Sequence, residues 1–273
     1  MKRYKLRNIL GGKRAVGYAI GLASTALLCS CGDFLTLKPL NDIVEENYWT
    51  EKADVQSVIN SCSSGLTTAD CMNRMFVWGE MRSDNVQRGA STGGDVQQVL
   101  LENLIETNGF TRWEAFYQVI NRCNTVIQHA PEVAEKDPNY TNGDMRANIA
   151  EAKALRALCY FYLIRTFRDV PYVTTASTDD SDIEASYRVP ATKFNDVLNA
   201  LIADLEGVRD DAVKIYPQVG YPVGEDFNSG RITRFGIDAL LCDMYLWAGQ
   251  YAKCMETANR VLNFKKDRYN ELL

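Results

Sequence analysis

The stretch AEAKALRALCYFYLIRTFRDVPYV, residues 150–173, decides the fold class. Apolar residues recur in it at steps of three and four, which predicts a helix, and they cover most of its faces. A helix that is apolar nearly all round is buried. We therefore expect a helix from about Met145 to Phe167 at the centre of the molecule, ended by the RDVP that follows. The segment VPYVTTAS, which begins at Val170, is compatible with a short strand.

Amphipathic helices are predicted on both sides of this central helix. Upstream, FYQVINRCNTVI at residues 116–127 carries an apolar stripe. Thr111 and Glu114, three residues apart, form the pattern of a capping box in front of it. Pro131 is expected to end this helix. Two further helices are expected, and their caps are Thr50 and Thr192.

The last hairpin is the clearest unit of the sequence. In GRITRFGIDALLCDMYLWAGQYAKCMETANRVL, residues 230–262, Thr233 opens one helix, Gly249 ends it, and a second helix begins one residue later. The pair resembles a tetratricopeptide repeat unit, a helical hairpin that stacks on its neighbours. The helices at 145–167 and 192–213 resemble a second such pair. Small residues stand where the last two helices would approach each other, at Ala239, Ala248, Cys254 and Ala258.

The predicted fold class is therefore all-α. We expect tetratricopeptide-like helical hairpins that stack as a right-handed scaffold with long loop insertions. The insertions are expected at residues 67–106, 168–191 and 214–232. Loops of this length in a compact domain are usually functional or disordered.

The chain begins with the features of an export signal. Residues 1–30 contain six basic residues and no acidic one. The apolar run at 15–28 is shorter than the roughly 20 residues that span a bilayer. It ends in LLCSCGDFL, where Ser30 directly precedes Cys31, and this arrangement resembles a bacterial lipobox. We expect a lipoprotein signal peptide over residues 1–30 and a lipid on Cys31. An ordinary signal with incidental cysteines is the alternative, and Cys29 fits the lipobox less well.

The net charge argues against two classes of partner. The whole chain carries a charge of −5, and without the basic leader 24 basic residues face 35 acidic ones, a charge of −11. Nucleic acids and anionic lipid surfaces are recognised by basic patches, so we expect binding to neither. A lipid on Cys31 would instead hold the chain at a membrane, because its acyl chains supply more than one anchoring signal.

Six cysteines follow Cys31, and none of them forms a CxxC pair, so no zinc site is expected. Most of them lie within helical apolar patterns, where a free cysteine acts as a small apolar residue. Cys62 and Cys71 are close in sequence. A disulfide between them is left open, because an exported chain permits one.

Several segments, in order, resemble the SusD/RagB family of outer-surface lipoproteins of Bacteroidota. They are CGDFLTLKP from residue 31, NYWTEKADV from residue 47, and the three helical segments that start at residues 116, 150 and 230. The resemblance spans residues 31–273, and the helical segments are its most specific part. Cys123 and Cys254 stand where such helices more often carry alanine, a change between small residues that the packing should tolerate.

The resemblance implies an α-helical protein that caps a TonB-dependent porin of the SusC type. It would capture a nutrient, most often a glycan, at the outer surface of the outer membrane, where its lipid anchors it. Family members are usually much longer, so residues 31–273 would be the N-terminal helical domain and the C-terminal half would be missing. The alternative is a surface scaffold or adhesin whose repeats bind another protein. A peptide ligand also remains open in place of a glycan.

The candidate ligand-binding residues lie in the insertion FVWGEMRSDNVQRGASTGGDV. A sugar ring packs on a flat aromatic face, and its hydroxyl groups pair with planar polar side chains. Trp78 offers the flat aromatic face. Arg82, Asp84 and Asn85 offer the planar polar side chains. A second aromatic cluster has Tyr221 between Tyr216 and Phe227. The alternative is structural: Trp78 would pack into the core, and the two residues after Ser83 would cap a turn.

The sequence contains few patterns that are typical of a catalytic site. The sequence has no HExxH or P-loop pattern. Glu80 and Asp84 would make a glycosidase pair only in a suitable pocket, and in a polar segment solvated carboxylates are the simpler interpretation. His129, the only histidine, precedes Pro131 near an expected helix end, where a favourable contact with the helix dipole explains it better than catalysis. We therefore expect a binding protein that is not an enzyme and needs no metal or cofactor.

Overall fold

The computed structural model of the chain describes residues 48–177, 188–216 and 230–272, with side chains as far as residue 264. The expected signal peptide, Cys31, Tyr221 and Phe227 lie outside the described residues. Within them the chain forms helices joined by loops, together with two short strands. The all-α fold class is confirmed.

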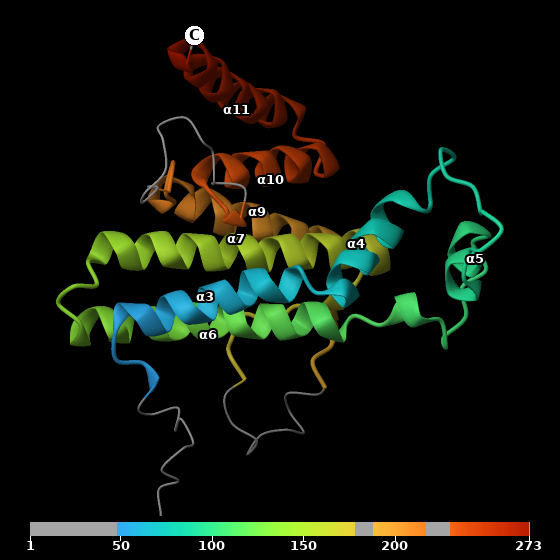
Figure 1. The fold of residues 1–273 in the computed structure, drawn as a ribbon, viewed down its shortest axis with the longest axis horizontal. Coiled ribbons are helices and arrows are strands. Elements are labelled where there is room, and N and C mark those ends of the chain that lie inside the picture. Colours follow the sequence, from blue (N-terminus) through green and yellow to red (C-terminus); the bar gives the residue numbers. More distant parts are fainter. Residues whose placement is uncertain (1–47, 178–187, 217–229, 273) are drawn as a thin grey trace, which may run out of the picture. The chain divides into compact units, whose positions relative to one another are not determined.

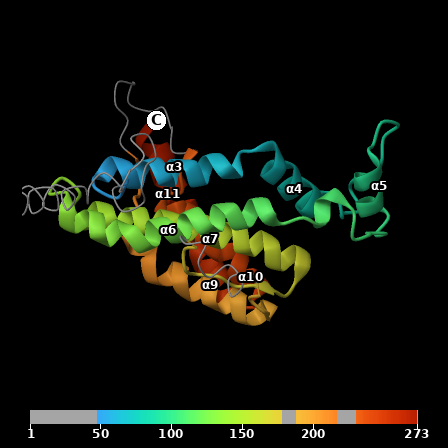
Figure 2. The ribbon, with the colours of Figure 1, turned by 90° about the horizontal axis from the view of Figure 1, so that it is seen from below.

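The central helix is α7 (Asn142–Phe167), and it begins three residues earlier than expected. Thr141 and Asp144 form a capping box at its start, in which each side chain accepts a hydrogen bond from the other residue's backbone N–H. Buried residues cover most faces of α7. It packs against α6 (Glu114–Lys136) on one side and α9 (Phe194–Val208) on the other, as Figures 1 and 2 show. The expected central position is confirmed.

The helix α3 (Lys52–Leu66) lies along α6, so that α3, α6, α7 and α9 follow one another side by side (Figure 2). Its N-cap is Glu51, so the expectation that Thr50 caps it is wrong by one residue. Thr50 instead donates from its backbone N–H and its hydroxyl to Asp54, at 3.0 and 3.1 Å.

Two expectations about α6 are wrong. The helix continues through Pro131 to Lys136, because its apolar stripe continues past the proline and buries Val133. This burial offsets the hydrogen bond that proline cannot make. No capping box forms at its start either, where the N-cap is Trp113. Thr111 belongs to a preceding 3-10 turn, η1 (Gly109–Thr111), and its hydroxyl donates to a backbone carbonyl in that turn.

The first expected loop, residues 67–106, contains two helices that the sequence reading missed. They are α4 (Ala69–Glu80), capped by Thr68, and the short α5 (Gly94–Leu100). Buried Arg74 of α4 donates from Nε and Nη2 to carbonyl oxygens of Arg112 and Gly109, at 2.7 and 3.0 Å. These distant partners hold α4 against the η1 turn, and no local pattern reveals them.

The second insertion forms a short antiparallel pair, β1 (Val170–Pro171) and β2 (Ala191–Thr192), with Val170 opposite Thr192. The expected strand is therefore confirmed. Thr192 is not the cap of α9, because it belongs to β2 and the helix starts at Phe194. Asp169, next to β1, accepts from the backbone N–H of Phe194 at 3.0 Å and so caps the helix from a distance in sequence.

The last hairpin consists of α10 (Arg234–Trp247) and α11 (Tyr251–Leu272), which pack on each other (Figure 1). Thr233 caps α10 by accepting from the backbone N–H of Gly236. Gly249 ends the helix with a φ of +69°, a conformation that glycine adopts without steric cost. The expected hairpin and both of its end signals are confirmed.

Buried charges join these helices, and several lie in the segments on which the family resemblance rests. Glu151 of α7 is 1% exposed and accepts hydrogen bonds from the Arg231 guanidinium, with Nε at 3.0 Å. The Tyr216 hydroxyl donates to the same carboxylate at 3.1 Å. This cluster ties the chain on both sides of residues 217–229 to α7.

A second cluster is centred on Arg156 of α7. Its Nη2 donates to Asp204 of α9 at 2.6 Å, and its Nη1 donates to the side-chain oxygen of Asn124 of α6 at 2.8 Å. Lys153 also contacts Asp204, at 2.5 Å. A buried charge costs several kcal/mol unless it is paired. The polar residues of this stretch therefore orient three helices relative to one another.

The cysteines of the helical core are free. Cys62, Cys71, Cys123 and Cys159 are buried, and the disulfide left open between the first two is not formed in the structure. Burial raises the pKa of Cys71 and Cys159, which keeps both as neutral thiols. The interpretation of these residues as small apolar residues is consistent with this environment.

Candidate functional site

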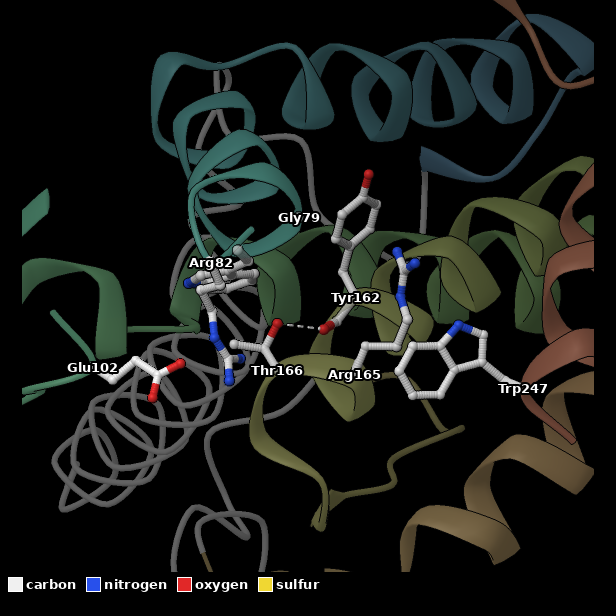
Figure 3. A pocket seen from close by; sticks show the side chains of 8 residues that line it. Gly79, Arg82, Glu102, Tyr162, Arg165, Thr166 and Trp247 are labelled. Atoms are coloured by element: carbon white, nitrogen blue, oxygen red, sulfur yellow. Dashed lines mark hydrogen bonds between the residues drawn. The ribbon is translucent and has the colours of Figure 1, made fainter. Parts of the chain in front are cut away.

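A cleft of about 290 Å³ lies where the C-terminal ends of α4, α7 and α10 meet (Figure 3). This volume is near the lower end of the range of about 300–1,000 Å³ that is typical of ligand sites. It therefore suits a short segment of a ligand rather than a whole polymer. Its lining residues are Trp78, Gly79, Arg82, Glu102, Tyr162, Arg165, Thr166 and Trp247.

Trp78 forms a closed wall of the cleft. Only 8% of the residue is exposed, and its Nε1 donates to the carbonyl oxygen of Phe110 at 2.9 Å. Its ring contacts Phe116 and Phe167, with centroids 5.0 and 5.3 Å away. These contacts fix the ring. Trp78 is therefore mainly a core residue, as the structural alternative expects, and it also lines the cleft.

Trp247 provides the exposed aromatic ring of the cleft. It is the last residue of α10 and is 49% exposed. Its ring is held edge-on to Phe161 of α7, with a centroid distance of 6.3 Å, and contacts Phe194 of α9 at 6.0 Å. An aromatic ring that is held on one side and open on the other offers a flat apolar surface to a ligand.

Arg165 stands next to Trp247 in the cleft (Figure 3). Its guanidinium carbon lies 4.3 Å from the ring centroid of Phe161 and 4.8 Å from that of Tyr162, so two rings of its own helix hold it. Its Nη1 also donates to Asp243 of α10 at 3.4 Å. Its Nε is buried and has no hydrogen-bond partner within the described residues. The charged group is thus positioned mainly by ring contacts and keeps donor capacity.

Arg82 and Glu102 lie on the opposite side of the cleft from Arg165 and Trp247, with Thr166 between the pairs (Figure 3). Arg82 is exposed in the turn that follows α4. Glu102 follows α5 with a φ of +53°, in the left-handed conformation that commonly ends a helix. The Thr166 hydroxyl donates to the backbone carbonyl of Tyr162 at 2.8 Å and can still accept a hydrogen bond from a ligand.

Together these residues present one open aromatic face with hydrogen-bonding groups around it. The guanidinium groups of Arg82 and Arg165 donate, the Glu102 carboxylate accepts, and the Thr166 oxygen accepts. A sugar has an apolar face of C–H groups and a rim of hydroxyl groups that both donate and accept. The cleft therefore matches a hydroxylated ring better than an extended apolar ligand.

The structure brings together two of the five expected ligand-binding residues, Trp78 and Arg82. Asp84 and Asn85 are exposed in the turn after α4 and do not line the cleft. Tyr221 lies outside the described residues, as does the expected lipidation site, Cys31. Tyr216, of the second aromatic cluster, is held by Glu151 and by the Arg231 guanidinium over its ring at 4.2 Å.

The sequence analysis missed most of the cleft. Trp247 lies two residues before the helix-ending Gly249, and no sequence pattern marks it as exposed. Arg165 carries a weak signal, because it is a charged residue that directly follows the apolar run at residues 157–164. Glu102 and Thr166 carry no such signal.

One GxSxG pattern occurs in the chain and was not recognised from the sequence. Residues 89–93, GASTG, match the GxSxG spacing of nucleophilic serines, which sit on a sharp turn between a strand and a helix. Here the segment is a turn in which the backbone N–H of Gly89 donates to the Thr92 hydroxyl at 2.8 Å, and no strand precedes it in the described chain. His129 is stacked on Trp49, with ring centroids 4.9 Å apart and its Nδ1 3.4 Å from Glu132. The motif therefore lacks the context of a nucleophile.

The described residues show neither a metal site nor a membrane-spanning helix. No group of three or more histidine, cysteine or carboxylate side chains there is placed to hold a metal ion. None of the helices described combines the length and the apolar character that a membrane span requires.

Stacked helical hairpins with a small polar and aromatic cleft at their ends define a helical-repeat binding protein. The family described as "Starch-binding associating with outer membrane", a SusD-like family, matches residues 33–209. The chain belongs to this SusD-like family. Membership in a family described by binding, and not by a reaction, agrees with the expectation that the chain is not an enzyme.

One relative by sequence supports the same family, and two solved structures share the fold. SusD-like protein P38 of Formosa agariphila is 30% identical over 187 residues, which cover 68% of this chain and 35% of that protein. A SusD superfamily protein of Bacteroides thetaiotaomicron is 24% identical with a TM-score of 0.66, over 79% of this chain and 48% of the other. A laminarin-binding SusD-like protein is 21% identical with a TM-score of 0.62, over 78% and 43% of the two chains. The chain spans about a third to a half of the length of these relatives.

Proposed function

We propose that the chain is a glycan-binding surface lipoprotein that captures oligosaccharides for uptake through a SusC-like TonB-dependent porin. Family membership supports the glycan, since the family is described by starch binding and one structural relative by laminarin binding. It also supports a position at the outer membrane. Residues 31–273 would contribute the helical domain of such a protein, after removal of the signal peptide.

The open face of Trp247, with Arg165 beside it and Arg82 across the cleft, is the observation that carries the glycan assignment. A stacked ring and flanking donors recognise a sugar without reacting with it, and none of the cleft residues is paired as a nucleophile with a base. The cleft accepts only a short part of a chain, so a polysaccharide would contact it with a few residues and extend beyond it. Arg82 is the predicted site residue that remains best placed for this contact.

The direct test is binding of oligosaccharides to the purified chain without residues 1–30. Laminarin fragments and starch fragments serve as probes, with binding followed by calorimetry. Replacing Trp247 by alanine should weaken the binding of the best probe about tenfold, which corresponds to about 1.4 kcal/mol. Phe76→Ala is the matched control, because Phe76 is also an exposed aromatic residue but lies outside the cleft.

Equal affinities for the wild type and Trp247→Ala would remove the cleft from the proposal. The remaining predicted residues Asp84, Asn85 and Tyr221 then become the first alternatives, because the first two do not line the cleft and Tyr221 lies outside the described residues. Asp84→Ala and Asn85→Ala, measured with the same probes, would show whether the turn after α4 carries the binding instead.

Binding to the proposed porin partner would distinguish a nutrient-capture protein from a purely structural one. A chain that caps a porin should co-purify from detergent-solubilised outer membranes with a SusC-like TonB-dependent protein. A surface scaffold or adhesin would instead bind another protein and no oligosaccharide. If the chain is recovered without a porin and binds no oligosaccharide, the scaffold or adhesin alternative is favoured.

The lipid anchor is proposed at Cys31 because Ser30 and the apolar run precede it. Labelling cells with a palmitate analogue should mark the wild-type chain and leave Cys31→Ala unmarked. Cys29→Ala is the control and should be labelled as the wild type is. Labelling of Cys31→Ala at the wild-type level would move the assignment to the other cysteine.

A further inference from the structure

Two cysteines of the last hairpin face each other across its two helices. The Sγ atoms of Cys242 on α10 and Cys254 on α11 lie 3.3 Å apart. The Sγ of Cys242 is also 3.5 Å from the backbone carbonyl oxygen of Cys254. Both residues are partly exposed, whereas the other four described cysteines are buried. This pair therefore combines short separation with access to reagents in solution.

We propose that Cys242 and Cys254 form a disulfide bond that joins α10 to α11 after export. The inference rests on the proposed export of the chain, because disulfides persist in oxidising compartments outside the cytoplasm. The thiols lie close enough that small side-chain rotations bring the two sulfur atoms to bonding distance. The sequence spacing of 12 residues shows nothing of this, because only the fold of the hairpin places the two thiols opposite each other.

The reaction requires an oxidant of the disulfide class, such as glutathione disulfide or the disulfide of a thiol oxidase. One cysteine thiolate attacks a sulfur of the oxidant, a mixed disulfide forms, and the first thiolate of the oxidant leaves. The second cysteine thiolate then attacks the mixed disulfide at the protein sulfur and releases the second thiolate of the oxidant. In sum the two cysteines lose two electrons and two protons, and the oxidant gains both and becomes two thiols.

The chemistry of Cys242 predicts how the rate depends on pH. Burial and the hydrogen bond with Cys254 raise the pKa of Cys242 to about 11. Each cysteine must act once as a thiolate, so Cys242 limits one of the two steps at neutral pH. The rate of cross-linking should therefore rise as the solution is made mildly alkaline.

The location of the bond gives it a structural role. Among the described side chains of α11, only Thr257 is buried, so this helix is the least enclosed of the long helices. Helices with few buried contacts open more readily than the rest of a fold. A bond near the start of α11 restrains this opening. The enclosed loop is short, so the bond acts locally on the hairpin.

Trypsin provides a clean assay, because cleavage after Arg234, Lys253 and Arg260 places the two cysteines on separate peptides, 235–253 and 254–260. In the first arm, the full chain is purified in reductant and dialysed into a glutathione redox buffer as oxidising as exported compartments. In the second arm, the full chain is recovered from cell envelopes with free thiols blocked at lysis. Mass spectrometry then looks for a linked peptide pair that reduction splits.

The linked pair in both arms is the expected result, and in Cys242→Ala it should be absent. The oxidised wild type should also melt at a higher temperature than the reduced one, while reductant leaves the melting of Cys242→Ala unchanged. If both peptides carry the thiol block in the first arm, the pairing is wrong. If the pair is linked in the first arm and free in the second, the proposed disulfide in cells is overturned, whereas export itself is tested separately by the palmitate labelling at Cys31.

Discussion

The hairpin of α6 and α7 and the hairpin of α10 and α11 come from similar sequence patterns but differ in what covers them. α7 is buried on most of its faces and packs on α6 and on α9. α10 buries one stripe, and α11 turns Tyr251, Met255 and Leu262 outward, each 64% exposed. The first hairpin is thus a core element, and the second is covered on one side only.

The difference lies in the kind of contact that holds each hairpin. In α7 a large apolar surface surrounds a few paired charges. In the last hairpin a buried carboxylate joins the helices. Asp238 of α10 accepts from Arg209 after α9, at 2.6 and 2.8 Å, and from Arg260 of α11, at 3.1 Å. An exposed helix can thus be held in place by one buried ion cluster. The predictions below test this contrast.

The largest effect is expected from Asp238→Ala. Asp238 is fully buried, and its hydrogen bonds raise the pKa of Arg209. Its loss leaves two arginines without their shared buried partner, which should lower the free energy of unfolding by about 3–5 kcal/mol. Urea unfolding followed by circular dichroism measures this loss.

Asp210→Ala is the matched control, because Asp210 also binds Arg209, at 2.6 Å, but its side chain is 83% exposed. An exposed ion pair contributes about 0–1 kcal/mol, so this variant should unfold nearly as the wild type does. Equal effects of the two substitutions would mean that burial of the carboxylate does not decide the strength of this cluster.

The buried stripe of α10 should give the next largest effect. Leu241 is buried, so Leu241→Ala should destabilise the chain by about 2–5 kcal/mol through loss of apolar contact and a cavity. Leu246 lies on the same helix and is largely exposed, so Leu246→Ala should change stability by about 0.5 kcal/mol or less. Thermal unfolding of both variants checks the difference. A small effect at Leu241 would show that α10 is as weakly enclosed as α11.

The same contrast explains which parts of the fold were predictable. Apolar periodicity depends on the local sequence alone, so α7 and both helices of the last hairpin were located correctly. The errors fall where a distant partner decides. Asp169 caps α9 in place of Thr192, and Arg74 holds the η1 turn in which Thr111 lies. Neither partner can be found from the spacing of residues near the helix ends.

The candidate site was less predictable for a related reason. Trp78 and Arg82 lie only four residues apart, so the pattern of neighbouring residues was enough to predict them together. Arg165 and Trp247 are far apart in sequence, and only the packing of α10 on α7 brings them to one cleft. Trp78 also shows that an aromatic residue in an expected loop can be a core residue, because an unrecognised helix, α4, carries it.

A smaller effect is expected at the outward stripe of α11. The three apolar side chains at 251, 255 and 262 follow helical spacing and form one exposed face, and such faces favour association. We expect the purified chain without residues 1–30 to self-associate as its concentration rises. Met255→Lys should weaken this association by about 1.5–3 kcal/mol, the free energy of burying one such side chain. Light scattering after size-exclusion chromatography measures it, with Met72→Lys on α4 as the exposed control. A wild-type chain that is monomeric at every concentration contradicts the prediction.

The smallest effect concerns the residues that end α7 and α10, which share a φ of +69°. In the last hairpin this residue is Gly249, and in α7 it is Arg168, where Asp169 N–H donates to the Phe167 carbonyl oxygen at 3.0 Å across a tight three-residue turn. At Arg168, where ψ is −80°, this is a strained γ-turn. A sparsely populated backbone conformation costs a residue with a Cβ about 1–3 kcal/mol, and glycine adopts positive φ readily. Arg168→Gly should therefore stabilise the chain by about 0.5–1 kcal/mol, after the greater entropy of glycine in the unfolded chain is deducted.

The reciprocal change separates backbone strain from the loss of a side chain. Gly249→Ala adds a Cβ that meets no atom within 4 Å, so any loss of stability, expected at about 1 kcal/mol, comes from the backbone conformation alone. Arg168→Ala keeps the Cβ and removes only the exposed guanidinium, so it should leave the stability within about 0.5 kcal/mol of the wild type. If Arg168→Gly is no more stable than Arg168→Ala in urea unfolding, the turn after α7 is not strained. The two helix ends would then differ in more than the identity of one residue.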